Sequence, residues 1–300
     1  MTTDPHKRSG LKLGLASLGL VMFVFIGVFV FGPERDQVEP GPIAPEQRVS
    51  VLDILEDAPT RSAVEALRAA APATYAALDA EAAYAQADGA SAAEMSGLVL
   101  EALFSQFQLQ ASAIKSADST AHQDILAGFA GGLKRLKSNN SAWCEGSTVA
   151  DYLTQNEDEL VPSLLSEFPY QSAQYEWAME WMTVVLNAAK QGQVRPLRYQ
   201  KPGFRDETLL QQEGLALGSE QWALALQIAA FANSEGTSYA KMKEVIAGMD
   251  VCDLGIAVET VSARLPADVR GRIWSDLMPE IMVGNTPYVM WRVTDYFFIG

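Results

Sequence analysis

The longest apolar stretch of the chain lies near its start. The run from Leu13 to Phe31 contains no charged residue and nothing more polar than Ser17. A helix that rises about 1.5 Å per residue would cover roughly 30 Å over this run, which is the thickness of a bilayer's hydrocarbon core. A core helix of a globular domain would keep a polar stripe, whereas every face is apolar here. We therefore expect a transmembrane helix over residues 13–31.

The residues on either side of this run predict its orientation. Lys7, Arg8 and Lys12 lie in the short tail 1–12, and acidic residues predominate after the run. Because basic residues favour the cytoplasmic side, we expect a cytoplasmic tail and a periplasmic domain, held in the inner (plasma) membrane by an uncleaved anchor. A cleaved secretory signal is the alternative. The bulky residues at Phe29–Phe31 argue against it, because a signal peptidase requires small ones.

The pattern changes twice after the apolar run. Residues 32–48 are rich in proline and charge, which predicts an extended linker that keeps the next domain within roughly 50 Å of the bilayer. From residue 49 the apolar positions have helical spacing, and Ser91 with Glu94 forms a capping box. The segment 172–191 has two apolar faces, typical of a central helix. Residues 49–300 are therefore predicted to form an all-α domain, a bundle or helical-hairpin array, with 192–205 as the seam if it has two lobes.

The composition removes several classes of function. A formal net charge of −15 over 300 residues argues against a broad basic face for nucleic acid or anionic lipid. His122 is the one histidine of the predicted domain, and its polar neighbours indicate a solvent-facing side chain. Multi-histidine metal sites are thereby excluded. The sequence contains no P-loop, G-x-S-x-G, H-E-x-x-H or C-x-x-C motif, so we predict no metal and no cofactor.

The two cysteines of the chain, Cys144 and Cys252, are candidates for a disulfide. An oxidising compartment outside the cytoplasm would favour a bridge between them, and the long enclosed loop would make that bridge stabilising. Two separately buried thiols are the alternative.

One carboxylate pair suggests chemistry. Glu176 and Glu180 are four residues apart on one helical face, beside Trp177 and Trp181. An acid near tryptophan can act as a general acid on a sugar bond, which would make the domain a muramidase-like glycan hydrolase. The same spacing is common on a solvated helix face, and we regard that as the stronger interpretation.

Two other segments suit the binding of a partner. The first is a basic, aromatic-containing loop in an otherwise acidic domain, where an anionic ligand or an acidic segment could dock. A solvated connection between lobes is its alternative. The second is the aromatic C-terminus, which either packs on its own domain or inserts into a partner or membrane surface. The candidate residues are Arg195, Arg198, Tyr199, Lys201 and Arg205 in the loop, and Trp291, Tyr296, Phe297 and Phe298 at the C-terminus.

These patterns predict a single-pass membrane protein whose extracytoplasmic domain acts by binding. Its expected contacts are the bilayer, through residues 13–31, and a protein partner in the cell envelope. A scaffold, adaptor or assembly factor is the favoured class. The alternatives are the glycan hydrolase and a chaperone-like helical module that holds exported chains. Catalysis is the less favoured reading, because the sequence contains no catalytic motif.

Overall fold

The computed structural model describes most of the predicted domain. The described residues are 49–152, 168–218 and 246–283, together with Ser166, Glu244, Asn285, Tyr288, Val289, Arg292 and Tyr296. The predicted tail 1–12, membrane helix 13–31 and linker 32–48 lie outside these residues, as do Trp291, Phe297 and Phe298. Among the helices that are described, none combines the length and the apolar character needed to cross a bilayer.

The regular structure of these residues is entirely helical, which confirms the all-α prediction. Within them the only β-type pairing is an isolated bridge between Glu145 and Asp250. The elements are α3 (Val51–Ile54), α4 (Ala58–Ala70), α5 (Pro72–Ala87), α6 (Ala92–Lys115), α7 (Ser119–Ser138), η3 (Ala142–Cys144), α8 (Gly146–Tyr152), α10 (Ala173–Val194), α11 (Phe204–Leu217), α14 (Val251–Arg264) and α15 (Ala267–Met282).

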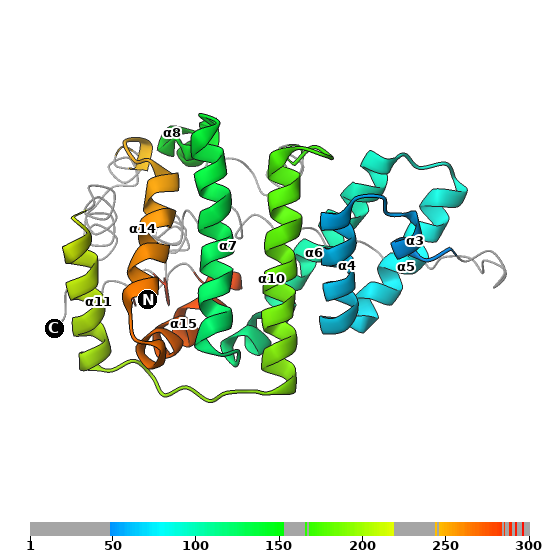
Figure 1. Cartoon of the computed structure of the whole chain (residues 1–300). Coiled ribbons are helices and arrows are strands. Elements are labelled where there is room, and N and C mark those ends of the chain that lie inside the picture. Colours follow the sequence, from blue (N-terminus) through cyan, green and yellow to red (C-terminus); the bar gives the residue numbers. More distant parts are fainter. Residues whose placement is uncertain are drawn as a thin grey trace, which may run out of the picture.

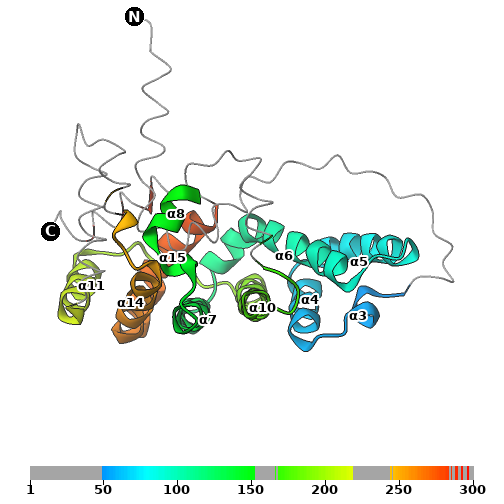
Figure 2. The ribbon, with the colours of Figure 1, turned by 90° about the horizontal axis from the view of Figure 1, so that it is seen from above.

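The helices form two layers. One row runs α11, α14, α7, α10, α4, with the helix axes side by side (Figure 1). Viewed from above, α15, α6 and α5 lie behind this row (Figure 2). A single cluster of buried apolar side chains runs from Val51 to Tyr296 between the layers. Each helix therefore buries one face against a neighbour, as an amphipathic helix must in a layered domain.

Helix α10 is the central element that its two apolar faces predict. It packs against α4, α6 and α7, and Tyr175, Trp177, Met179 and Trp181 are all buried. The close approach to α7 depends on Gly132, where an added Cβ would lie 2.0 Å from the indole of Trp177. A larger residue at this position would separate the two helices.

Local signals set the helix boundaries. At the start of α6 the predicted capping box is present: the Ser91 amide donates to the Glu94 carboxylate at 2.7 Å, and the Glu94 amide donates to the Ser91 hydroxyl at 3.3 Å. At the start of α10, the Ser172 hydroxyl accepts a hydrogen bond from the Tyr175 amide at 3.1 Å. Both caps satisfy amide donors that the first helical turn leaves unpaired.

Candidate functional site

Glu176 and Glu180 are exposed on α10, whereas the tryptophans beside them in sequence are buried. Glu180 forms an ion pair with Arg135 at 2.8 Å, and about half of each side chain is exposed. The indole N–H of Trp177 donates to the Gly128 carbonyl, and that of Trp181 donates to the Ile125 carbonyl. The two glutamates therefore stand on a solvated face, while both indoles are used to pack α10 against α7.

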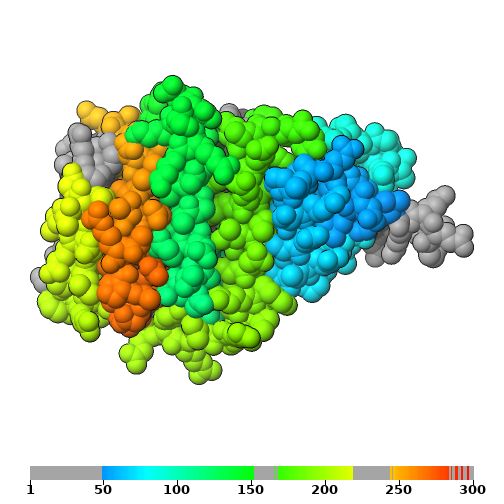
Figure 3. All heavy atoms as spheres, viewed as in Figure 1, coloured from blue at the N-terminus to red at the C-terminus, as the bar shows by residue number. Residues whose placement is uncertain are grey.

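An open groove of about 620 Å³ lies between α7 and α10. Figure 3 shows these two helices side by side in the row. Small side chains create it, because they leave space between two helices that are otherwise tightly packed. The α7 side is lined by Asp118, Thr120, Ala121, Asp124, Ala127 and Gly128, and the α10 side by Val184, Asn187, Ala188 and Gln191.

One end of the groove is held by Asp118, just before α7, and by Gln191, near the end of α10. One carboxylate oxygen of Asp118 accepts hydrogen bonds from the Thr120 and Ala121 amides and so caps α7. The other accepts from the Gln191 amide nitrogen at 2.6 Å, and the Asp118 backbone amide donates to the Gln191 side-chain oxygen at 3.1 Å. Asp124, by contrast, is exposed at the groove's edge. The result is an open channel with an apolar base and carboxylates beside it.

The predicted bridge between Cys144 and Cys252 is present, with Cα atoms 4.9 Å apart and a sequence separation of 108. It joins η3 to the start of α14. Asp250 lies beside the two sulfur atoms, in a cluster with the spacing of a metal site. Because both sulfurs are in the disulfide, neither is the thiolate that a metal would bind. The cluster is therefore structural.

The basic loop between α10 and α11 lies along the opposite edge of the row (Figure 1). The side chains of Arg195, Arg198 and Lys201 are exposed, and none has an ion-pair partner among the described residues. Tyr199 is the exception, because its ring turns inward over Gly271, where a Cβ would lie 2.4 Å from the ring. The loop's backbone is further fixed by the Leu197 amide, which donates to the Ser116 carbonyl at 2.8 Å.

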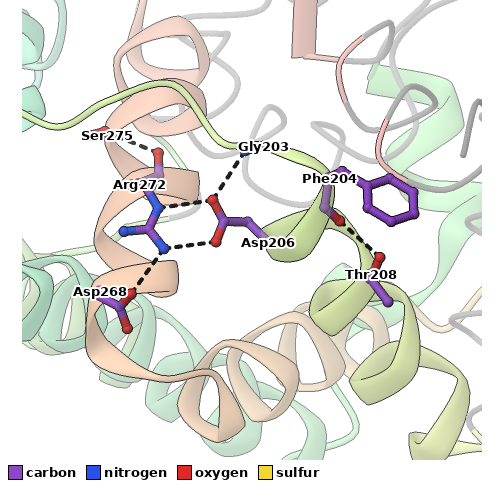
Figure 4. Close-up of polar contacts among 7 residues, drawn as sticks. All are labelled: Gly203, Phe204, Asp206, Thr208, Asp268, Arg272 and Ser275. Carbon is purple, nitrogen blue, oxygen red and sulfur yellow. Dashed lines mark hydrogen bonds and ion pairs between the residues drawn. The ribbon is translucent and has the colours of Figure 1, made fainter.

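Behind this loop lies an ion pair that sequence reasoning missed. Arg272 of α15 donates two hydrogen bonds to Asp206 of α11, at 2.8 and 2.7 Å, and a third to Asp268 at 2.9 Å (Figure 4). Asp206 also accepts from the Gly203 amide at 3.1 Å. The hydrogen bonds from Arg272 are the main cause that lowers the pKa of Asp206. The pair fastens α11 to α15 and therefore fixes the end of the basic loop.

The C-terminal residues that are described contact their own domain. Tyr296 is fully buried, and its hydroxyl donates to Asp276 at 3.0 Å. Arg292 donates to the same carboxylate at 2.8 Å, and its guanidinium lies 4.4 Å from the centre of the Tyr296 ring. Tyr288 donates to the other oxygen of Asp276 at 3.1 Å, and burial raises its pKa to about 12. At Tyr296, therefore, the aromatic C-terminal segment packs on its own domain.

The prediction of a solvent-facing His122 is wrong. The side chain is fully buried, its Nε2 lies 2.8 Å from the Ile114 carbonyl, and burial lowers its pKa. Nε2 must carry the hydrogen in this contact, because a carbonyl oxygen can only accept. The ring also lies 6.0 Å from that of Tyr199, measured between centroids. His122 therefore packs beneath the basic loop rather than facing water.

Comparison of the chain with protein-family models, with curated proteins and with solved structures finds no match. Function is therefore inferred from the geometry of the domain itself.

Proposed function

We propose that this chain is a membrane-anchored adaptor of the cell envelope, whose helical domain binds a segment of another protein in the groove between α7 and α10. The observation that carries the proposal is the groove itself, open along its length and lined by Ala127, Gly128 and Ala188. Helical domains commonly bind partner segments in such channels, with apolar anchors in the base and polar residues at the sides.

The charge of the groove indicates the kind of segment that fits. Asp118 and Asp124 flank the apolar base, and the whole chain is strongly acidic. A segment with small or medium apolar side chains and flanking lysines or arginines would complement this surface and would be attracted by it over a distance. An acidic segment would be repelled, so the partner class is a basic, amphipathic polypeptide.

Two further features support the proposed location. The run 13–31 has the length and composition of a membrane anchor, and its basic N-terminal flank favours a domain outside the cytoplasm. The disulfide between Cys144 and Cys252 suits an oxidising compartment.

Site-specific photo-crosslinking of the full-length protein in its native membrane tests the proposal. A photoreactive residue in place of Ala127, inside the groove, should give a discrete protein adduct whose crosslinked peptide is rich in lysine or arginine. The same residue in place of Ala69, exposed on α4, is the control and should not give that adduct. Adding Asp124→Lys to the Ala127 probe should weaken the adduct by roughly tenfold, because one attraction becomes a repulsion.

The proposal fails if the Ala127 probe yields no protein adduct, or if its adducts survive Asp124→Lys and match those of Ala69. A broad ladder of adducts with many exported proteins would instead identify the chaperone-like module.

A further inference from the structure

Large apolar side chains are exposed at one edge of the domain. Val194, Leu197 and Phe204 are 61, 45 and 72% exposed, and they lie in one short segment from the end of α10 to the start of α11. Such side chains normally turn inward or lie singly. Their concentration on one connecting loop therefore requires an explanation.

The cations of the same loop make the edge amphipathic. Arg195, Arg198 and Lys201 alternate with the apolar residues, and the sequence has no acidic residue between Glu180 and Asp206. The next acidic residue along the chain, Asp206, is turned inward and paired with Arg272, whereas Phe204 points away from that pair (Figure 4). The loop itself thus carries exposed cations and no carboxylate, although the chain as a whole is acidic.

The loop is held in place in spite of this exposure. Tyr199 packs over Gly271 and near His122, Pro202 is buried, and the Leu197 amide is bonded to the Ser116 carbonyl. Because the backbone is fixed, the outward residues form a preorganised row, and their docking costs little conformational entropy.

We infer that this row, residues 194–205, rests on the surface of a bilayer that contains anionic lipid. Clustered lysines and arginines are attracted to anionic headgroups, while phenylalanine and leucine enter the boundary between headgroups and acyl chains. The expected anchor 13–31 and linker 32–48 would keep the domain within roughly 50 Å of that surface. The acidic remainder of the domain is repelled by the same headgroups, which would orient this edge toward the membrane. In this respect the inference rests on the anchor of the proposed function, but not on the groove.

Full-length protein reconstituted in vesicles provides the test. An environment-sensitive fluorophore is attached at Phe204→Cys or, as the matched control, at Leu109→Cys, since these native side chains are 72 and 68% exposed. The vesicles are phosphatidylcholine alone, or phosphatidylcholine mixed with phosphatidylglycerol, each with a lipid-borne quencher. Position 204 should be quenched roughly threefold more strongly than position 109 in the anionic vesicles, since only position 204 would enter the lipid boundary.

A charge swap checks the cause. Arg198→Glu with Lys201→Glu should remove the additional quenching at position 204, because two attractions become repulsions. Arg68→Glu with Lys134→Glu changes the net charge equally at exposed positions elsewhere and should leave the quenching intact.

Vesicle flotation separates this inference from the proposed anchor. If the protein floats with the vesicles but positions 204 and 109 are quenched alike, the loop does not dock and the anchor stands. If the protein floats only with anionic vesicles, the loop docks and the anchor is wrong. If it floats with neither composition, both are wrong. If the fluorophore at position 204 is shielded from solvent only when a protein partner is added, the loop belongs to a protein interface. That result would overturn the inference.

Discussion

The two edges of the helical row in Figure 1 use charged residues in opposite ways. At the upper edge, where α7 ends and α14 begins, Lys137 contacts both Asp250 and Asp253, next to the disulfide. At the lower edge, Arg198 and Lys201 have no ion-pair partner among the described residues. Charged residues therefore pair with one another at the upper edge, whereas the cations of the lower edge are exposed and available for binding.

The contrast separates stability from binding. Residues of the upper edge are coupled to the fold by a covalent link and by pairing, so their removal should be measurable as lost stability. The exposed cations of the lower edge should contribute little to the free energy of unfolding. The ion pair behind them, between Asp206 and Arg272, should contribute much more. Substitutions at the disulfide, at the buried ion pair and at the exposed cations test this separation.

The largest effect is expected at the disulfide. Cys144→Ala with Cys252→Ala should lower the free energy of unfolding by about 4 kcal/mol, because the unfolded chain loses the constraint on a loop of more than 100 residues. Urea unfolding of the full-length protein in detergent, followed by tryptophan fluorescence, measures this loss. Wild-type protein unfolded under reducing conditions is the control and should show the same loss. A change below roughly 1 kcal/mol in both would mean that the upper edge is not held by the bridge.

The ion pair behind the lower edge comes next. Asp206→Ala should cost about 3 kcal/mol at neutral pH, because it leaves Arg272 partly buried without its main partner. Asp268→Ala removes a carboxylate from the same arginine and is the matched control. Its side chain is 63% exposed, so its removal should destabilise the domain far less than Asp206→Ala does. Equal losses from the two variants would contradict the view that burial gives the Asp206 pair its strength.

The pH dependence of this pair has a definite sign. The pKa of Asp206 is lowered from its ordinary value of 3.8, chiefly by hydrogen bonds from Arg272. Its contribution to stability is therefore fully present above pH 3.8 and is lost as the pH falls through the lower, folded-state value. The difference between wild type and Asp206→Asn should accordingly shrink in acid. A difference that stays constant with pH would indicate that the pair contributes by packing alone.

Local patterns in the sequence predict much of the fold. Two apolar faces identify α10 as the central helix, because helical periodicity places Met179 and Trp181 on different sides of one cylinder. The capping box at Ser91 and Glu94 is equally local, since both side chains belong to one turn. The disulfide could be predicted because the chain has only two cysteines to pair.

Features that depend on tertiary contacts could not be predicted in the same way. Asp206 and Arg272 are 66 residues apart, and nothing in their neighbourhoods marks them as partners. His122 lies in a polar helix start that is typical of a solvated turn, yet the end of α6 and Tyr199 cover it. The groove arises from Ala127 and Ala188, which look like unremarkable apolar positions until two helices place them opposite each other.

The smallest effects should distinguish the edges most directly. Lys137→Ala at the upper edge should cost about 0.5 kcal/mol, since the lysine side chain is 42% exposed and solvent screens its two ion pairs. Arg198→Ala at the lower edge should leave the free energy of unfolding unchanged, because this arginine has no ion-pair partner within the described part of the chain.

The pH dependence sharpens this last difference. Hydrogen bonds to Asp253 and Asp250 raise the pKa of Lys137 above its ordinary value of 10.5. Its contribution should therefore be complete below pH 10.5 and should disappear as the pH rises through the higher, folded-state value. Urea unfolding of wild type and both variants at neutral and strongly alkaline pH measures this, with the Arg198 variant tracking wild type throughout. If Arg198→Ala destabilises the domain as much as Lys137→Ala, the lower edge is also an internal contact, and its cations are not free to dock.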